Sequence, residues 1–219
     1  QMIWLKRLER EHDNMRAAMA WAQHRHEVEL GLRLSGALAS FWYRHSHIRE
    51  GSTWLQTFLR QDDEEGQPMT PASLVLARAC AVSGAGELAY RCGRFREAAY
   101  LNGRAVELYR AAGDRWGEAW ALNNLGITSA FFSDRGTAKV TLETSGGLFE
   151  EIGDRWGRGV SLANQCLLAL NNGDFDQALT LGEASQALLR RTGDESFLAS
   201  TINILGDAYR SYGNCGRAK

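Results

Sequence analysis

The stretch GDRWGEAWALNNLG at residues 113–126 returns as GDRWGRGVSLANQC at 153–166 and as GDESFLASTINILG at 193–206. The three copies therefore begin forty residues apart. Each opens with a Gly-Asp pair, in which glycine can close one helix in the left-handed conformation and aspartate can cap the start of the next. The fixed period, with a helix end and a helix start in every copy, predicts a helical repeat protein.

A second break lies about halfway through each period. The segments that form these breaks are RCGRF at 91–95, FSDRG at 132–136, NNGDF at 171–175 and SYGNC at 211–215. Between the breaks, apolar residues recur at helical spacing, as in Leu122 and Leu125. Each forty-residue unit is therefore expected to be a hairpin of two helices, each of about 17 residues and ~25 Å long.

Small residues also recur in register, and they indicate close packing of the two helices. They are Gly86, Gly126, Cys166 and Gly206 on the first helix and, twelve residues later, Ala98, Ala138, Ala178 and Ala218 on the second. With Leu205 before Gly206 and Tyr209 after it, the pattern resembles the tetratricopeptide repeat (TPR). The resemblance covers residues 72–219 and implies an all-α fold, a right-handed superhelix (α-solenoid) of helical hairpins. The family's closing proline is absent, and the period is forty residues rather than about 34.

The first third of the chain follows the same logic with looser spacing. The segment LASFWYRHSHIREGSTWLQTFL at 38–59 predicts another hairpin. The N-terminal helix expected before it carries a stripe of Leu5, Leu8, His12, Met15, Met19 and Ala22. The acidic segment RQDDEEGQPMTP at 60–71 holds both prolines, which predicts a loop.

These observations predict three parts. Residues 1–60 form an N-terminal helix and hairpin, 61–71 form an acidic loop, and 72–219 form the hairpin array. The sequence stops inside the second helix expected after SYGNC. The last hairpin is therefore expected to be truncated, and the chain to be a piece of a longer protein.

Two phrases of the first third resemble a larger kind of protein. LEREHDNMRAAMAWA at 8–22 and FWYRHSHIREGSTWL at 41–55 resemble the region after the ATPase core in bacterial STAND-class regulators, many of them LuxR-family transcriptional regulators. The resemblance implies that the helical array is the sensing and partner-binding arm of an ATP-dependent regulator. No GxxxxGK[ST] phosphate loop occurs, so ATP binding and hydrolysis are not expected of this chain alone.

Composition excludes several classes of function. The net charge of −1 gives no sign of a basic face, so direct nucleic-acid contact is not expected. No apolar run is long enough for a membrane span, and the charged start lacks a signal core, which predicts a cytoplasmic protein. The four cysteines, Cys80, Cys92, Cys166 and Cys215, form no CxxC pair, so free thiols are expected.

The histidines give little indication of a metal site. His24 and His26, and likewise His45 and His47, are two residues apart, and on a helix such pairs point to different faces. Glu9 and His12 supply one Glu-x-x-His motif, whereas a carboxylate-bridged dimetal site needs two. No sequence motif of a hydrolase, zinc protease or nucleotide-binding enzyme appears. We therefore expect a non-enzymatic protein without cofactor or metal.

The aromatic residues divide into two groups. Trp116 and Trp156 stand in repeat register, so they are expected to pack between hairpins rather than stack on a ligand. Phe41, Trp42 and Tyr43 are adjacent, and three adjacent side chains cannot share one face of a helix. At least one of these three is expected to be exposed and able to seat a partner.

In tetratricopeptide arrays the first helix of each hairpin lines a concave groove. The groove places in this chain hold Tyr90, Arg91, Trp120, Asn123, Asn124, Asn164, Asn171, Asn203, Asp207 and Arg210. Asparagine is a poor helix former, and its amide both donates and accepts, which suits an extended peptide. Related repeats use asparagine near the sixth place to hold peptides, but their groove lysines are missing here. That these amides cap turns or are merely solvated stays open.

The sequence thus predicts a protein-interaction and signal-sensing module that holds a protein or peptide partner. A receptor for a small-molecule inducer in the same groove remains the alternative, and a helical enzyme is a weaker third. Self-association through the truncated end is also left open.

Overall fold

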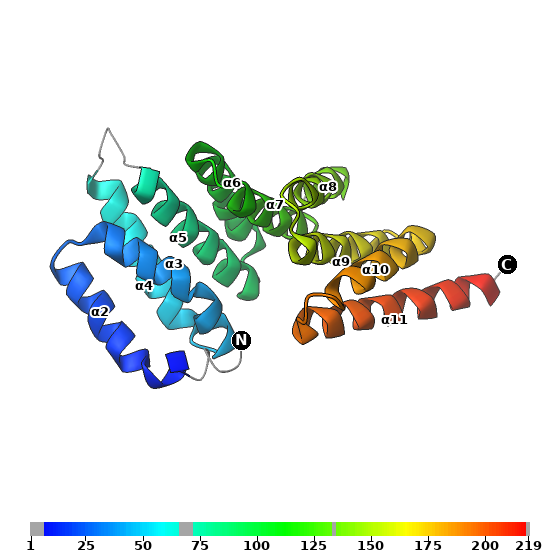
Figure 1. The fold of residues 1–219 in the computed structure, drawn as a ribbon, viewed down its shortest axis with the longest axis horizontal. Coiled ribbons are helices and arrows are strands. Elements are labelled where there is room, and N and C mark those ends of the chain that lie inside the picture. Colours follow the sequence, from blue (N-terminus) through cyan, green and yellow to red (C-terminus); the bar gives the residue numbers. More distant parts are fainter. Residues whose placement is uncertain (1–6, 66–71, 133–134, 218–219) are drawn as a thin grey trace. The chain divides into compact units, whose positions relative to one another are not determined.

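The computed structural model describes residues 7–65, 72–132 and 135–217, and within these ranges the chain is helical and contains no strand (Figure 1). The ten helices of these ranges are α2 (His12–His24), α3 (Val28–Arg44), α4 (Ile48–Glu65), α5 (Ala72–Arg91), α6 (Phe95–Ala112), α7 (Arg115–Ser129), α8 (Arg135–Glu151), α9 (Arg155–Asn171), α10 (Phe175–Leu189) and α11 (Glu195–Arg217). Residues 7–10 are helical as well. The all-α fold of helical hairpins predicted from the forty-residue period is confirmed.

The chain divides into two compact units, residues 1–117 and 118–219. In the first unit α3 packs against α2, α4 and α5, and α5 packs against α6. In the second unit α9 packs against α8 and α10, while α11 packs against α10 and α9. The boundary between the units lies inside α7.

The Gly-Asp pairs form the helix junctions that the sequence predicts. Gly113, Gly153 and Gly193 adopt φ values of 71°, 73° and 73°. The carboxylate oxygen Oδ1 of Asp154 then accepts hydrogen bonds from the backbone N–H groups of Trp156, at 2.9 Å, and of Gly157, at 3.1 Å. The equivalent aspartates of the other two copies cap α7 and α11 in the same way. One dipeptide therefore ends one helix and starts the next.

The midway breaks follow the prediction up to the last one. Gly93 and Gly173 adopt φ values of 73° and 78° and separate α5 from α6 and α9 from α10. In the break at 132–136, residues 133–134 lie outside the described residues, and α8 begins at Arg135.

The break predicted at 211–215 is wrong. Helix α11 runs without interruption from Glu195 to Arg217, and Gly213 does not take a positive φ. Glycine permits a left-handed turn but does not require one, and here the backbone of Gly213 keeps the helical conformation. Ala218, a member of the small-residue register, lies outside the described residues.

The first hairpin forms as predicted, from α3 and α4. Neither the turn between these helices nor the turn between α2 and α3 contains a glycine. His26, between α2 and α3, has a φ of 55°, and Ser46, between α3 and α4, has a φ of 62°. The expected stripe on the N-terminal helix is present, since His12, Met19 and Ala22 are buried, while Leu5 lies outside the described residues. The local signal for the two turns is weak, because histidine tolerates a positive φ better than most residues but less readily than glycine, and serine at position 46 is not a residue that favours it.

Part of the predicted acidic loop is helical. Helix α4 continues through Glu65, and residues 66–71, with both prolines, lie outside the described residues. Asp62 is buried, and its two carboxylate oxygens accept hydrogen bonds from the guanidinium group of Arg78 on α5. This bidentate pair raises the pKa of Arg78. Asp62, which the sequence assigned to an acidic loop, therefore holds α4 against α5 through its pair with Arg78.

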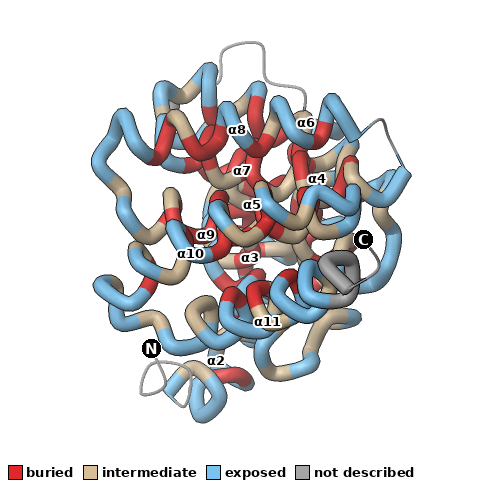
Figure 2. Tube along the Cα trace, turned by 90° about the vertical axis from the view of Figure 1, so that its right-hand side faces the viewer, coloured by how far each residue is buried: buried red, intermediate tan, exposed pale blue. Residues whose placement is uncertain are grey.

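The cores combine large side chains with glycine and alanine at close contacts. In the first unit the fully buried residues include Trp42, Leu55 and Phe58. In the second unit Ala138, Cys166 and Ala178 are fully buried at the predicted register places. Buried positions, red in Figure 2, alternate with exposed ones along the helices. The small-residue register therefore serves packing, as the sequence suggested.

Candidate partner-binding surface

Aromatic side chains form a row on the first helices of the second unit. The rings of Trp120 on α7 and Trp156 on α9 stack with centroids 5.3 Å apart and an interplanar angle of 22°. Phe197 on α11 meets Trp156 edge-on, with centroids 5.4 Å apart. Both geometries are favourable for aromatic pairs. Trp156 therefore packs between hairpins, as expected, whereas Trp116 is 44% exposed.

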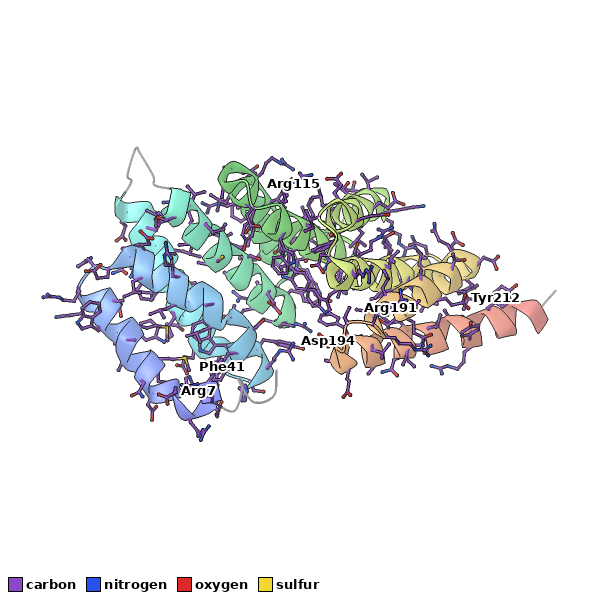
Figure 3. The ribbon with its side chains drawn as sticks, viewed as in Figure 1. Arg7, Phe41, Arg115, Arg191, Asp194 and Tyr212 are labelled. Carbon is purple, nitrogen blue, oxygen red and sulfur yellow. The ribbon has the colours of Figure 1, made fainter. Side chains whose placement is uncertain are left out.

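Asp194 ties this row to the repeat junction (Figure 3). Its Oδ1 caps α11 by accepting from the backbone of Ser196 and Phe197. Its Oδ2 accepts from the indole N–H of Trp156 at 3.2 Å. The same carboxylate thus starts α11 and fixes the orientation of the central ring of the row.

The asparagines of α7 and α9 contact one another. Asn123 is only 1% exposed, and its Oδ1 accepts a hydrogen bond of 2.9 Å from Nδ2 of Asn164. Its own Nδ2 lies 3.5 Å from Oδ1 of Asn124. The amide of Asn123 is therefore used inside the protein, whereas Asn124 and Asn164 are partly exposed.

A cavity of about 310 Å³ lies beside these amides. Its lining residues are Ile127, Ala130, Phe131, Arg135, Leu142, Asn164, Leu167, Leu168, Asn171 and Asn172. Asn171, at the end of α9, is exposed. The cavity therefore combines an apolar wall with amide groups that can donate to and accept from a ligand.

Tyr90 and Arg91 lie in the first unit, at the end of α5. The guanidinium carbon of Arg91 lies 3.8 Å from the ring centroid of Tyr43 and 5.6 Å from that of Tyr90. Burial raises the pKa of Tyr90, although Arg91 opposes the shift. Arg91 thus covers an aromatic surface by cation–π contact.

The adjacent aromatics of α3 differ from the expectation. Phe41 and Trp42 are 2% and 0% exposed, and Tyr43 is half-buried beneath Arg91. None of the three is an exposed docking residue, because α3 is packed on several sides by α2, α4 and α5. The sequence argument counted only the faces of one helix and missed that neighbouring side chains cover the faces that carry these three residues.

The remaining predicted groove residues lie on α11. Asn203, Asp207 and Arg210 are exposed, and the last two form an ion pair within the helix. The predicted set therefore falls into separate groups. The structure brings Asn123, Asn124 and Asn164 into contact, with Asn164 and Asn171 at the cavity.

Sequence reasoning missed one polar cluster in the first unit. His45 and His47 were expected to point to different faces of a helix, and this is wrong because they lie in the turn between α3 and α4. Both contact the carboxylate of Glu9, from His45 Nδ1 at 2.9 Å and from His47 Nε2 at 3.6 Å. The sequence offered two separate signals, the Glu-x-x-His motif of Glu9 and His12 and the closely spaced His45 and His47, but nothing that brings them together.

Comparison with known proteins places the fold but not a family. No family model matches the chain. Over 75 residues it is 35% identical to provisionally named HTH-type transcriptional regulators of Mycobacterium bovis and Mycobacterium tuberculosis. That match covers 34% of this chain and 8% of each relative, so the chain spans only a small part of their length.

Two of the solved structures with a similar fold cover most of this chain. BtubC from P. vanneervenii superposes with a TM-score of 0.70 at 19% identity, covering 94% of this chain and 84% of that one. A provisionally named kinesin light chain of Podosopora anserina, with nearly identical TPR-like repeats, gives a TM-score of 0.64 at 16% identity, covering 85% and 89%. Within the described ranges, no helix has both the length and the apolar character to cross a membrane. The chain has the fold of TPR-like helical-hairpin repeats.

Proposed function

We propose that the chain is a non-enzymatic protein-interaction module that holds an extended peptide segment on α7 and α9. The observation that carries the proposal is the cavity of about 310 Å³, where the amides of Asn164 and Asn171 stand at an apolar wall. An extended peptide offers backbone N–H and C=O groups to amides and apolar side chains to a pocket. The neighbouring row of Trp120 and Trp156 extends the surface with aromatic area.

A small-molecule inducer is the second candidate, supported by the same cavity. Its volume lies near the lower end of the range of small-molecule sites, about 300–1,000 Å³. Its wall is largely apolar with a few amide groups, which is the usual composition of such sites. The two candidates differ in extent, because a peptide would reach beyond the cavity toward Trp120, whereas a small molecule would not.

We place this module in a cytoplasmic transcriptional regulator that is ATP-dependent. The support is the 75-residue likeness to HTH-type regulators and the phrases at 8–22 and 41–55 that resemble STAND-class proteins. The reading frame around the coding sequence tests this placement. It should encode a phosphate-binding loop upstream and a helix-turn-helix downstream, and a frame with neither would remove the proposal.

A peptide library displayed on phage tests the binding proposal. Asn171 is exposed and its side-chain amide forms no hydrogen bond with the described residues, so Asn171→Ala should leave the melting temperature nearly unchanged. We expect peptides selected on the wild-type chain to bind this variant about tenfold more weakly, as when a ligand loses a good hydrogen bond. Gln56→Ala, which removes an exposed amide from α4 in the first unit, is the matched control.

Three results would decide between a peptide and a small-molecule inducer as the ligand of the cavity. Peptides that bind wild type and Asn171→Ala equally contradict the cavity as the binding site. Trp120→Ala should weaken peptide binding but not binding of a small molecule held within the cavity. A selection that enriches no peptide, together with a small molecule recovered from a compound screen that protects the chain thermally, would favour the inducer.

A further inference from the structure

Five ionisable side chains meet near the N-terminus of the first unit. They are Glu9, His12, His45, His47 and Glu50. Glu9 comes from the helical segment 7–10, His12 from the start of α2, and His47 from the turn before α4. One ligand atom from each of these three residues lies within 4.8 Å of the other two. Such spacing allows a single ion to reach all three.

The two histidines are held in place by packing. His12 is 8% exposed, and its ring lies 4.4 Å from that of His47, centroid to centroid. Phe41, labelled in Figure 3, meets His12 edge-on at 5.2 Å and lies 5.8 Å from His47. Nε2 of His47 is buried and has no hydrogen-bond partner among the described residues. A buried polar atom without a partner is costly, and a metal ion would satisfy it.

The surrounding groups resemble the outer shell of a metal site. A ligating histidine usually gives its other ring N–H to a carboxylate, which fixes the ring. Here Oε1 of Glu50 lies 3.2 Å from Nε2 of His12, so one nitrogen of His12 is engaged and the other remains for a metal. Arg16 in turn holds Glu50 through two hydrogen bonds, of 2.8 and 2.6 Å.

Glu9 has a similar support on its other side. Its Oε2 lies 2.9 Å from Nδ1 of His45, while its Oε1 points to His47 at 3.6 Å. No arginine or lysine of the described ranges forms an ion pair with Glu9. A divalent cation would supply a positive charge to balance the negative charge of this carboxylate.

We propose that Glu9, His12 and His47 bind a Zn²⁺ ion, with His45 and Glu50 orienting the ligands. Two imidazoles and one carboxylate are a known ligand set for Zn²⁺, and they leave a fourth position for water. Mg²⁺ and Ca²⁺ prefer oxygen ligands and do not fit a site with two histidines. The ion would join the segment 7–10, α2 and the α3–α4 turn. Its effect would therefore be to fasten the N-terminal helix to the first hairpin.

The test uses the full 219-residue chain, purified without a histidine tag and treated with a chelator. Calorimetric titration should show about one Zn²⁺ per chain, and saturating Zn²⁺ should raise Tm by several degrees, because an ion that binds only the folded state stabilises it. Mg²⁺ should do neither. Co²⁺ in place of Zn²⁺ should give visible absorption bands of a tetrahedral site without a thiolate charge-transfer band.

Matched variants locate the site. Glu9→Gln keeps the shape of an exposed side chain and should weaken Zn²⁺ binding about tenfold or more, with circular dichroism unchanged. His47→Gln should do the same. The control is His24→Gln with His26→Asn, which changes an exposed pair of equal spacing and keeps a residue that tolerates the positive φ at 26.

Several outcomes would overturn the proposal. These are the absence of stoichiometric Zn²⁺ binding to the wild-type chain, binding that survives both Glu9→Gln and His47→Gln, and binding that only the control pair abolishes. A thiolate band with Co²⁺ would assign the ion to the cysteines instead.

Discussion

The N-terminal region, residues 7–65, and the periodic region, residues 72–217, build helical hairpins in different ways. In the periodic region a close contact is repeated, since Gly117 faces the ring of Tyr109 and, forty residues later, Gly157 faces the ring of Phe149. In the N-terminal region Gly31 faces Phe58 and Gly51 faces Trp42, and neither pair recurs at the period. The periodic region repeats one glycine–aromatic contact, whereas each such contact in the N-terminal region is made by an unrelated pair of residues.

The junctions show the same difference. In the periodic region left-handed glycines stand before α6, α7, α9, α10 and α11, and an aspartate caps each of these helices except α6, whose N-cap Arg94 makes no side-chain cap hydrogen bond. Most of these junctions are therefore encoded within a few residues. In the N-terminal region His26 and Ser46 take positive φ values, and α2 and α3 have no side-chain cap. Their turns are maintained by the packing of the helices on either side. A repeat can therefore be read locally, whereas the N-terminal region depends on long-range contacts.

The largest loss of stability should come from removing a large buried side chain of the N-terminal region. Trp42 is fully buried, and a Cβ on Gly51 would lie 2.5 Å from its ring. Trp42→Ala should lower the free energy of unfolding by about 3–5 kcal/mol through lost contacts and a cavity, as measured by urea denaturation. Trp42→Phe should lose much less, because it keeps most of the packing and removes an indole N–H that has no partner among the described residues. Equal losses for the two variants would contradict this account of the N-terminal region.

How far the sequence predicts the fold follows from this contrast. The forty-residue period, the Gly-Asp junctions and the small-residue register were read correctly, because helix caps and helix contacts depend on nearby residues. The break at SYGNC was predicted from the same local signal and does not form. A glycine permits a turn but does not require one.

The candidate site could be predicted only in part. The sequence placed Asn123, Asn124 and Asn164 at groove positions, but not the hydrogen bond that uses Asn123 inside the protein. That bond depends on how α7 and α9 lie against each other, which no local pattern encodes. The contact between Glu9 and His47 joins residues far apart in the sequence, and it is invisible for the same reason.

A smaller effect should come from adding one methyl group to the repeated contact. A Cβ on Gly157 would lie 2.2 Å from the ring of Phe149, which is fully buried. Gly157→Ala should therefore cost about 1–3 kcal/mol of unfolding free energy by overpacking. Gly147→Ala is the control in the neighbouring helix, because a Cβ there would meet nothing within 4 Å. It should gain about 0.5–1 kcal/mol from better helix propensity. If both substitutions stabilise, the repeated contact is looser than the structure indicates.

The smallest loss of stability should come from removing a single N-cap side chain. We expect this loss in the periodic region but not in the N-terminal region. Asp154 is the N-cap of α9 and accepts two backbone N–H hydrogen bonds, at 2.9 and 3.1 Å. Asp154→Ala leaves those donors without the carboxylate and should cost about 1 kcal/mol. Glu27 occupies the N-cap position of α3, but its side chain forms no cap hydrogen bond. Glu27→Ala should therefore change the unfolding free energy by less than about 0.5 kcal/mol. Urea denaturation of both variants measures the difference, and Asp154→Asn, which keeps a capping oxygen, should recover most of the loss. A loss at Glu27 equal to that at Asp154 would mean that the N-terminal region also relies on its caps, and the distinction between the two regions would then fail.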